Sequence, residues 1–325
     1  MSSPPSSAAS FPALIDADLL RSLVPMTDAI EASAAAFAAA AAGEVTGPLR
    51  SALSRHRVLV MPAEHSSGSA IVKVISLQPD GWKEGLPSIG GCVLWVDGGT
   101  GRITAMLDGA SFTALRTGAA SGLATSLLAP PNSSVLAMLG AGGQAADQVS
   151  AVCAVRPVTE VRVFSRRGDR REKLCAQLTA AYPGVTFQAC GSPREAVRGA
   201  DVICTATRSS VPLFEASDLG PQVHINAVGA YTPAMCELAA EVFGQAAIVV
   251  IDQLDAALAE AGDLLQAIEA GQLRRDSLVE LGHLLGGQAT RPTGLTVFKS
   301  VGIAAQDWAL GEVAVARARA GVADD

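Results

Sequence analysis

A glycine-rich turn between an apolar run and a helical pattern constrains the fold of this chain more than any other feature. Residues 136–145 read LAMLGAGGQA, a G-x-G-x-x-A spacing. Gly140 permits a tight turn, Gly142 lets the backbone approach a pyrophosphate, and Ala145 lets a helix pack closely on the preceding strand. The first turn of that helix offers unpaired N–H donors to an anion. The segment therefore predicts a dinucleotide site at a strand-to-helix turn.

The residues after Pro130 repeat the same alternation. We expect strands at 134–139, 160–164, 185–188, 201–204, 224–228 and 248–251, and helices at 144–155, 169–181 and 193–198. Strands separated by helices predict a parallel, doubly wound sheet of the Rossmann type. We assign residues 130–295 to this dinucleotide-binding domain, and the fold class is α/β.

The residues before Pro130 have a different period. Helical patterns at 13–23 and 28–42 precede strand patterns at 57–61, 69–77, 91–97 and 103–107, and a helix is expected at 108–128. These predict an α+β domain with an antiparallel sheet. Residues 294–320 read as helical, and we expect them to complete this domain. Residues 13–129 and 296–325 would then form a substrate-binding and dimerisation domain, preceded by a disordered tail at 1–12.

Composition excludes several classes of protein. A chain of 325 residues suits two domains rather than a small binding module. The net charge of −7 leaves no basic face for nucleic acid. No run of about 18 large apolar residues is present, so no membrane span is expected. Six scattered cysteines without a CxxC pair indicate no metal site. The first residues do not resemble a signal peptide, so we expect a cytoplasmic protein.

The second strand of the expected parallel sheet discriminates between the two nicotinamide cofactors. An acidic residue at its end would bind the ribose 2′-hydroxyl of NAD, but this chain has Ser165, Arg166 and Arg167. A hydroxyl and two guanidiniums suit a 2′-phosphate, which favours NADPH, with NADH still possible. The alternative is a solvated helix start, since Arg170 and Arg171 continue the basic run.

Two further strand ends are candidate cofactor contacts, because ligands bind outside the carboxyl ends of parallel strands. Their residues, which also suit ordinary turns, are Thr205, Ala206, Thr207, Val228 and Gly229.

Cationic side chains are scarce before Pro130, so their positions are informative. Arg50 follows Gly47 and Pro48, Lys73 lies within a β-branched run, and Arg116 lies in the expected 108–128 helix. Taken singly, each suits a surface or structural role. As a group, these three residues would clamp a carboxylate, which arginine binds through two parallel hydrogen bonds.

These features and several motifs make the chain similar to the ornithine cyclodeaminase/mu-crystallin family. The matching segments, which run from about residue 48 to 310, are 61–63, Lys73, 107–109, 113–117, 139–145, 226–229, 237–238, 262–263 and 296–302. The resemblance implies a homodimer joined through the N-terminal sheets. It also implies a nicotinamide cofactor and a small α-amino or α-imino acid held by its carboxylate.

The resemblance assigns roles to individual positions. Arg50, Lys73 and Arg116 match the positions that hold the carboxylate. Matches to cofactor-contacting positions are Ser88, Thr117, Gln144, Ser165, Arg166, Arg167, Thr205, Val228 and Lys299. To these we add Arg116, the glycines Gly140, Gly142 and Gly143, and the strand-end residues Ala206, Thr207 and Gly229.

One departure from the family pattern bears on the reaction. Cyclodeaminases of this family carry an Asp where Tyr231 stands, and a tyrosine with a reference pKa of about 10 is neutral at pH 7. The chain is more similar to the branch that reduces cyclic imino acids. We therefore expect NADPH-dependent reduction of Δ1-pyrroline-2-carboxylate to L-proline, and of Δ1-piperideine-2-carboxylate to L-pipecolate.

Several points stay open at this stage. The proton for the reduction would come from water, Ser51, His56 or Tyr231. The alternative functions are ornithine cyclodeaminase, an alanine-type amino-acid dehydrogenase and a mu-crystallin-like ligand-binding protein.

Overall fold

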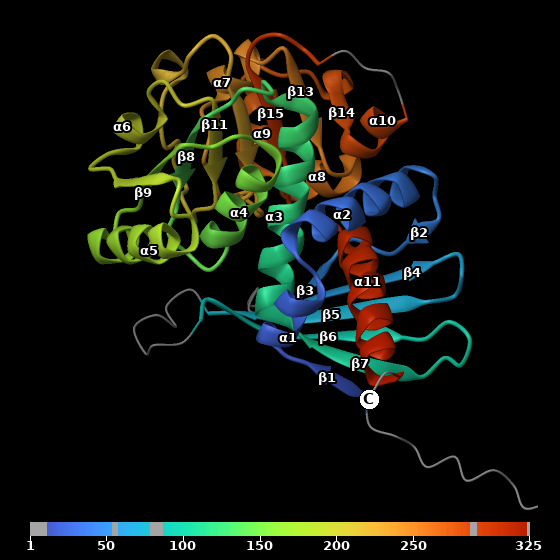
Figure 1. Ribbon diagram of the computed structural model, residues 1–325. Coiled ribbons are helices and arrows are strands. Elements are labelled where there is room, and N and C mark those ends of the chain that lie inside the picture. Colours follow the sequence, from blue (N-terminus) through green and yellow to red (C-terminus); the bar gives the residue numbers. More distant parts are fainter. Residues whose placement is uncertain (1–11, 54–57, 79–86, 287–290, 324–325) are drawn as a thin grey trace, which may run out of the picture.

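Two β-sheets and one long helix that connects them organise the molecule. The computed structural model describes residues 12–53, 58–78, 87–286 and 291–323. Figure 1 shows an upper body built on one sheet and a lower body built on the other, with helix α3 (Gly109–Leu128) running from the lower body into the upper one. The predicted α/β class is confirmed.

The sheet of the lower body is largely antiparallel. Its strands are β1 (Ala13–Ile15), β2 (Val45–Thr46), β3 (Ser51–Ala52), β4 (Val58–His65), β5 (Ala70–Leu77), β6 (Ile89–Val96) and β7 (Ile103–Asp108). The order is β1-β7-β6-β5-β4-β2, and β3 also pairs with β4. Among the described strands of this lower sheet, only β1 pairs in parallel, and its partner is β7.

The sheet of the upper body is parallel throughout its described pairs. In order, its strands are β10 (Thr186–Ala189), β9 (Glu160–Phe164), β8 (Val135–Leu139), β11 (Val202–Thr205), β12 (His224–Ala227), β15 (Thr296–Lys299), β13 (Ile248–Ile251) and β14 (Leu278–Glu280). The chain runs outward from β8 in one direction and then returns to β11 on its other side. The point where the order reverses therefore lies between β8 and β11.

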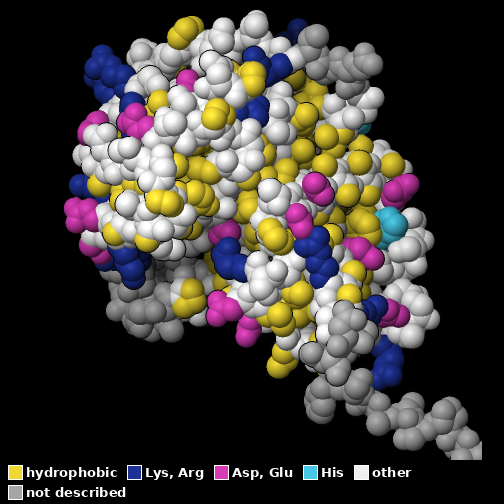
Figure 2. Space-filling view, in the orientation of Figure 1, with side chains coloured by type: hydrophobic (Ala, Val, Ile, Leu, Met, Phe, Trp, Pro, Cys, Tyr) yellow, Lys and Arg dark blue, Asp and Glu magenta, His cyan; other side chains and the backbone are white. Residues whose placement is uncertain are grey.

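Helices cover both sheets. Besides α3 they are α1 (Ala17–Leu23), α2 (Met26–Ala41), α4 (Ala145–Val155), α5 (Gly168–Ala181), α6 (Pro193–Val197), α7 (Ala240–Gln245), α8 (Leu254–Glu260), α9 (Gly262–Glu269), α10 (Leu281–Leu285) and α11 (Ala304–Ala323). In the described residues no helix is long and apolar enough to cross a membrane. Figure 2 shows charges of both signs scattered over the visible face rather than one basic patch.

Helix α3 is buried along almost its whole length because its packing face is made of small residues. A Cβ on Gly118 would meet the backbone oxygen of Asp147 at 2.6 Å, and one on Gly122 would meet Ile30 at 2.6 Å. Helices α2 and α4 can therefore approach the α3 backbone closely. This contact fixes the glycine turn before α4 relative to the lower sheet.

Two sequence predictions about elements are wrong. Residues 13–15 are a strand rather than a helix: they pair in parallel with residues 105–107 of β7, and Ile15 is 1% exposed in the core. The helix begins only after Asp16, whose carboxylate accepts a hydrogen bond from Leu19 N. Thr296–Lys299, expected to be helical and part of the first domain, is the fully buried strand β15 of the upper sheet. The helices and strand between 254 and 285 were not predicted.

The C-terminal helix α11 returns to the lower sheet as expected. Trp308 donates through Nε1 to Ser69 Oγ at 3.0 Å and stacks on His65. A Cβ on Gly311 would meet Ile71 and Trp95 of the sheet, so this helix lies directly on β5 and β6. The crossing from β15 to α11 brings residues 300–307 between the two bodies.

Candidate active site

The glycine turn lies where the order of the upper sheet reverses. Gly140 has φ 115°, and a Cβ there would lie 2.6 Å from the backbone oxygen of Ala206 at the end of β11. A side chain is excluded both by this contact and by the backbone conformation. The turns after β8 and β11 therefore meet at the edge where parallel sheets bind nucleotides.

The turn leaves room for an anionic group. Cβ atoms built on Gly142 and Gly143 would meet no heavy atom within 4 Å, and helix α4 begins at Ala145, directly after Gln144. Open space beside a helix N-terminus fits a pyrophosphate. The residues of this turn would hold the phosphates of a nicotinamide nucleotide.

Gly142→Ala is expected to weaken NADPH binding by roughly tenfold or more without lowering the thermal unfolding midpoint, because the added methyl fills only the space meant for the nucleotide. Fluorescence titration and thermal melting measure the two effects. Gly184→Ala, at a turn with equally open surroundings, is the matched control and should change neither. Unchanged NADPH affinity in Gly142→Ala would remove the pyrophosphate from this turn.

The buried Glu237 organises the two other strand ends that the sequence singled out. Its carboxylate accepts hydrogen bonds from Thr205 Oγ1 at 2.8 Å, Thr207 N at 2.6 Å and Thr207 Oγ1 at 2.7 Å. It also accepts from Gly229 N at 2.7 Å and Ala230 N at 3.2 Å. Burial raises the pKa of Glu237, whereas Lys299 and Thr207 oppose that shift. Glu237 thus ties the turn after β11 to the turn after β12.

Lys299, at the end of β15, serves the same turn. Its ammonium donates to the backbone oxygen of Ala230 at 2.7 Å and lies 3.2 Å from Asp263 Oδ1, and both charged side chains are fully buried. This pair fixes the backbone next to Tyr231. Val228 is buried in the same turn.

A second buried charge cluster joins the lower sheet to α3 and α11. Lys73 Nζ lies 2.8 Å from Asp307 Oδ1, and Arg116 Nε lies 3.3 Å from the same oxygen. Arg116 also donates to Gln306 Oε1 at 3.2 Å. Lys73 and Asp307 are 0% exposed and Arg116 is 6% exposed. Two of the three predicted cations therefore share one carboxylate that the sequence did not reveal.

Burial and the neighbouring charge of Arg116 lower the pKa of Lys73 to about 7, and Asp307 opposes this shift. An exposed lysine, with its ordinary pKa of 10.5, stays protonated at neutral pH. Gly302 bounds the same cluster, because a Cβ there would lie 2.2 Å from Arg116 Nη1.

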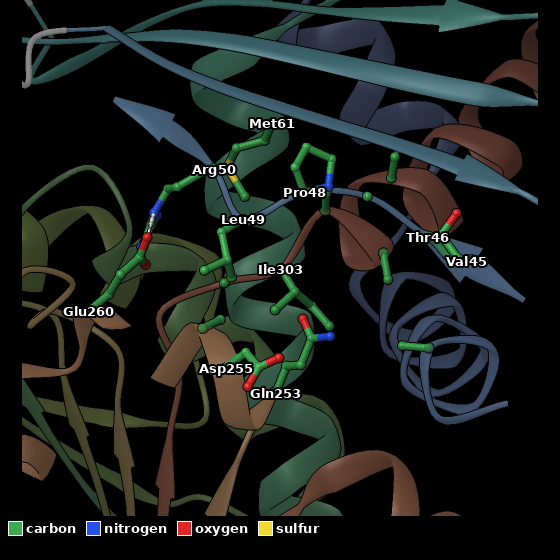
Figure 3. Close-up of a pocket in the computed structure, with 17 residues that line it drawn as sticks. Val45, Thr46, Pro48, Leu49, Arg50, Met61, Gln253, Asp255, Glu260 and Ile303 are labelled. Carbon is green, nitrogen blue, oxygen red and sulfur yellow. Dashed lines mark hydrogen bonds and ion pairs between the residues drawn. The ribbon is translucent and has the colours of Figure 1, made fainter. Parts of the chain in front are cut away.

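Arg50 reaches this region from the β2–β3 connection. It donates from Nε to Glu260 Oε1 at 2.7 Å and from Nη2 to Glu260 Oε2, and its guanidinium lies 5.7 Å from the ring centroid of Tyr231. Figure 3 shows the side chains of Arg50 and Glu260 pointing toward each other beside a cavity of about 260 Å³. Gly302, which abuts Arg116, lines the same cavity as Arg50, and the charge of Arg50 lowers the pKa values of both Lys73 and Arg116.

The other predicted site residues are placed as follows. Ser51 is exposed on β3, Ser88 is half-buried before β6, and Thr117 is buried on α3, where it donates to Thr113 O. Ser165 and exposed Arg166 follow β9, and Arg167 pairs with Asp169. Ala206 is half-buried after β11. His56 lies outside the described residues.

Comparison with known proteins identifies the family of this chain. The family model of the ornithine cyclodeaminase/mu-crystallin family matches residues 15–321. The chain belongs to this family. The predictions of the family and of a nicotinamide-dependent oxidoreductase are confirmed.

Three similar proteins illustrate the likeness. A Δ1-pyrroline-2-carboxylate reductase of Bacillus cereus is 35% identical over 305 residues, covering 90% of this chain and 93% of the relative. The structure of the Thermococcus litoralis Δ1-pyrroline-2-carboxylate reductase, in complex with NADH and L-proline, matches with a TM-score of 0.90 and 31% identity, covering 95% and 98%. An archaeal alanine dehydrogenase dimer with bound NAD matches with a TM-score of 0.86 and 30% identity, covering 95% and 97%.

Proposed function

We propose that this protein reduces cyclic imino acids, Δ1-pyrroline-2-carboxylate to L-proline and Δ1-piperideine-2-carboxylate to L-pipecolate. The observation that carries the proposal is the pairing of Lys73 and Arg116 on Asp307, together with Arg50, whose guanidinium lies 5.7 Å from the ring centroid of Tyr231. The likeness to Δ1-pyrroline-2-carboxylate reductases supports it.

The cations bind and orient the substrate. Arg116 and Lys73 are buried and held in place by Asp307, so they present charge to a carboxylate with little loss of side-chain freedom. A bound nicotinamide nucleotide supplies a hydride, which the C2 carbon of a cyclic imine accepts. The clamp fixes that carbon by holding the adjacent carboxylate.

Tyr231 bears on the choice between reduction and deamination near neutral pH. Burial raises the pKa of Tyr231 above its ordinary value of 10.0, so its hydroxyl stays neutral there. A neutral tyrosine cannot supply the carboxylate that cyclodeaminases of this family carry at this position, which argues against deamination of ornithine.

NADPH is proposed as the preferred cofactor because Ser165 and the exposed Arg166 follow β9 where an acidic residue would favour NAD. Replacing both, Ser165→Asp with Arg166→Ile, is expected to shift the ratio of kcat/KM for NADPH over NADH by about 100-fold toward NADH. Initial rates at varied cofactor concentration give this ratio. A ratio equal to that of the wild type would show that the 2′-phosphate lies elsewhere.

A homodimer joined through the lower sheets is also proposed. Leu14 and Met106 are cross-strand partners on the sheet face away from the core, and they are 68% and 37% exposed. Ile103 on the same strand is 45% exposed. Exposed apolar side chains on a sheet face suit a partner surface. Sedimentation equilibrium tests this assignment.

The experiment that tests the reduction is an NADPH-oxidation assay with a substrate panel. The five- and six-membered cyclic imino acids should be turned over, and pyruvate with ammonia should react at least about 100-fold more slowly in kcat/KM because it lacks the preformed cyclic imine. Ornithine with NAD should release no ammonia. Faster turnover of pyruvate with ammonia would assign an alanine-type dehydrogenase instead.

A further inference from the structure

We propose that Glu260 is an exchangeable carboxylate: the substrate carboxylate displaces it from Arg50, and the released Glu260 then pairs with the protonated ring nitrogen. This inference rests on the proposed function and assigns to α8 a residue that contacts the substrate. It makes Glu260 a determinant of specificity for ligands that combine a carboxylate with a cationic nitrogen.

The contact between Arg50 and Glu260 already has the form of a bound substrate carboxylate. Both oxygens of Glu260 engage the Nε–Nη2 edge of the guanidinium, in the two-pronged geometry with which arginine binds carboxylates. One such edge accepts one carboxylate in this geometry. A substrate that uses the same edge must therefore replace Glu260.

Glu260 is placed to leave, whereas Asp307 is not. The Glu260 side chain is 18% exposed, is the last residue of α8 and borders the cavity of about 260 Å³. Asp307 is 0% exposed and neutralises both Lys73 and Arg116. Removing Asp307 would leave two buried cations without a counter-ion, whereas moving Glu260 requires only a rotation of its side chain into the open cavity.

The charges of the site give the released carboxylate a partner. Asp307 pairs with both Lys73 and Arg116, and Asp252 also acts on Arg116, whereas Glu260 is the carboxylate paired with Arg50. A bound substrate carboxylate takes the place of Glu260 at Arg50, and a protonated imine then adds one positive charge beside it. An unpaired buried cation is costly, so a free Glu260 next to that nitrogen stabilises the protonated, more electrophilic imine.

Two carboxylate ligands that NADPH cannot reduce separate the two roles of Glu260. Pyrrole-2-carboxylate has a neutral ring nitrogen, and L-proline has an ammonium. In the NADPH complex of Glu260→Gln, we expect pyrrole-2-carboxylate to bind more tightly because its competitor is gone. L-Proline loses its partner, so the ratio of the two dissociation constants should shift by at least about tenfold toward pyrrole-2-carboxylate. Isothermal titration calorimetry measures both constants.

The matched control is Asp255→Asn, which removes the same charge from the same helix beside the same cavity. It should leave the ratio within about twofold of the wild type. Glu260→Asp retains a carboxylate and should restore most of the preference for L-proline. If both dissociation constants of Glu260→Gln change by the same factor, Glu260 has only a structural role and the proposal is overturned. The proposal is also overturned if Asp255→Asn shifts the ratio of the two dissociation constants as much as Glu260→Gln does.

These measurements also separate the inference from the reduction itself. If Glu260→Gln shifts the ratio of dissociation constants but the wild-type enzyme does not reduce the imines, the role of Glu260 stands and the proposed reaction is wrong. If the wild-type enzyme reduces the imines but Glu260→Gln keeps the wild-type ratio, the reaction stands and the role of Glu260 is wrong.

Discussion

Arg116→Met is expected to lower kcat/KM for Δ1-pyrroline-2-carboxylate by about 10²–10³-fold, mainly by raising KM, while NADPH affinity changes little. Arg116 is 6% exposed, shares Asp307 with Lys73, and abuts Gly302, which lines the same cavity as Arg50. Two charge-assisted hydrogen bonds to a buried carboxylate are together worth about 3–4 kcal/mol, which corresponds to that loss. Steady-state kinetics and NADPH titration measure the two quantities.

A matched control shows whether the effect belongs to the site. Arg102→Met removes the same charge from an exposed turn between β6 and β7 and should leave kcat/KM within about twofold. Near-normal turnover by Arg116→Met, with an unchanged thermal unfolding midpoint, would contradict a carboxylate clamp at this position.

Asp307→Asn is expected to lower the free energy of unfolding by about 3–5 kcal/mol and to abolish most activity. Asp307 is the carboxylate that Lys73 and Arg116 share, and all three groups are buried. An asparagine leaves both cations without a counter-ion. Urea denaturation measures the stability, and Asp276→Asn, which breaks an exposed pair with Arg274, should change it little.

The pH dependence of the Asp307→Asn defect has a definite sign. The folded-state pKa of Lys73 is about 7, below its ordinary value of 10.5, and loss of Asp307 lowers it further. In Asp307→Asn, the unfolded chain therefore holds one more proton than the folded chain over a wider pH range than in the wild type. The loss of stability relative to wild type should therefore grow as pH falls below about 7 and shrink above it. A loss that is constant from pH 6 to 9 would contradict the assignment of this pKa shift.

The local patterns of the chain predicted much of the nucleotide-binding edge. The glycine turn at 140–145, the strand at 160–164 and the helix at 109–128 have periods and turn residues that suit only one local structure. The strand at 296–299 was not predicted, because a short, fully buried strand shows no alternation of apolar and polar residues. Its neighbours β12 and β13 are also distant in sequence. Its partners are set by tertiary packing alone.

The acidic members of the site were missed for a related reason. Asp307 precedes Trp308 near the start of a helix and Glu260 ends one, both ordinary positions for an exposed acid. No local signal marks their pairing with Lys73, Arg116 and Arg50, which lie far away along the chain. The scarcity of lysine and arginine before Pro130 revealed the cations. Their partners become visible only when β15, α8 and α11 are placed.

Transfer of deuterium tests the central claim most directly. The wild-type enzyme is incubated with NADPH carrying deuterium at the transferable C4 position and with Δ1-pyrroline-2-carboxylate, and the product is examined by mass spectrometry and NMR. A carboxylate-anchored imine that accepts hydride at C2 predicts proline with one deuterium at that carbon. Proline without deuterium at C2, or deuterium in alanine from pyruvate and ammonia but not in proline, would contradict the account.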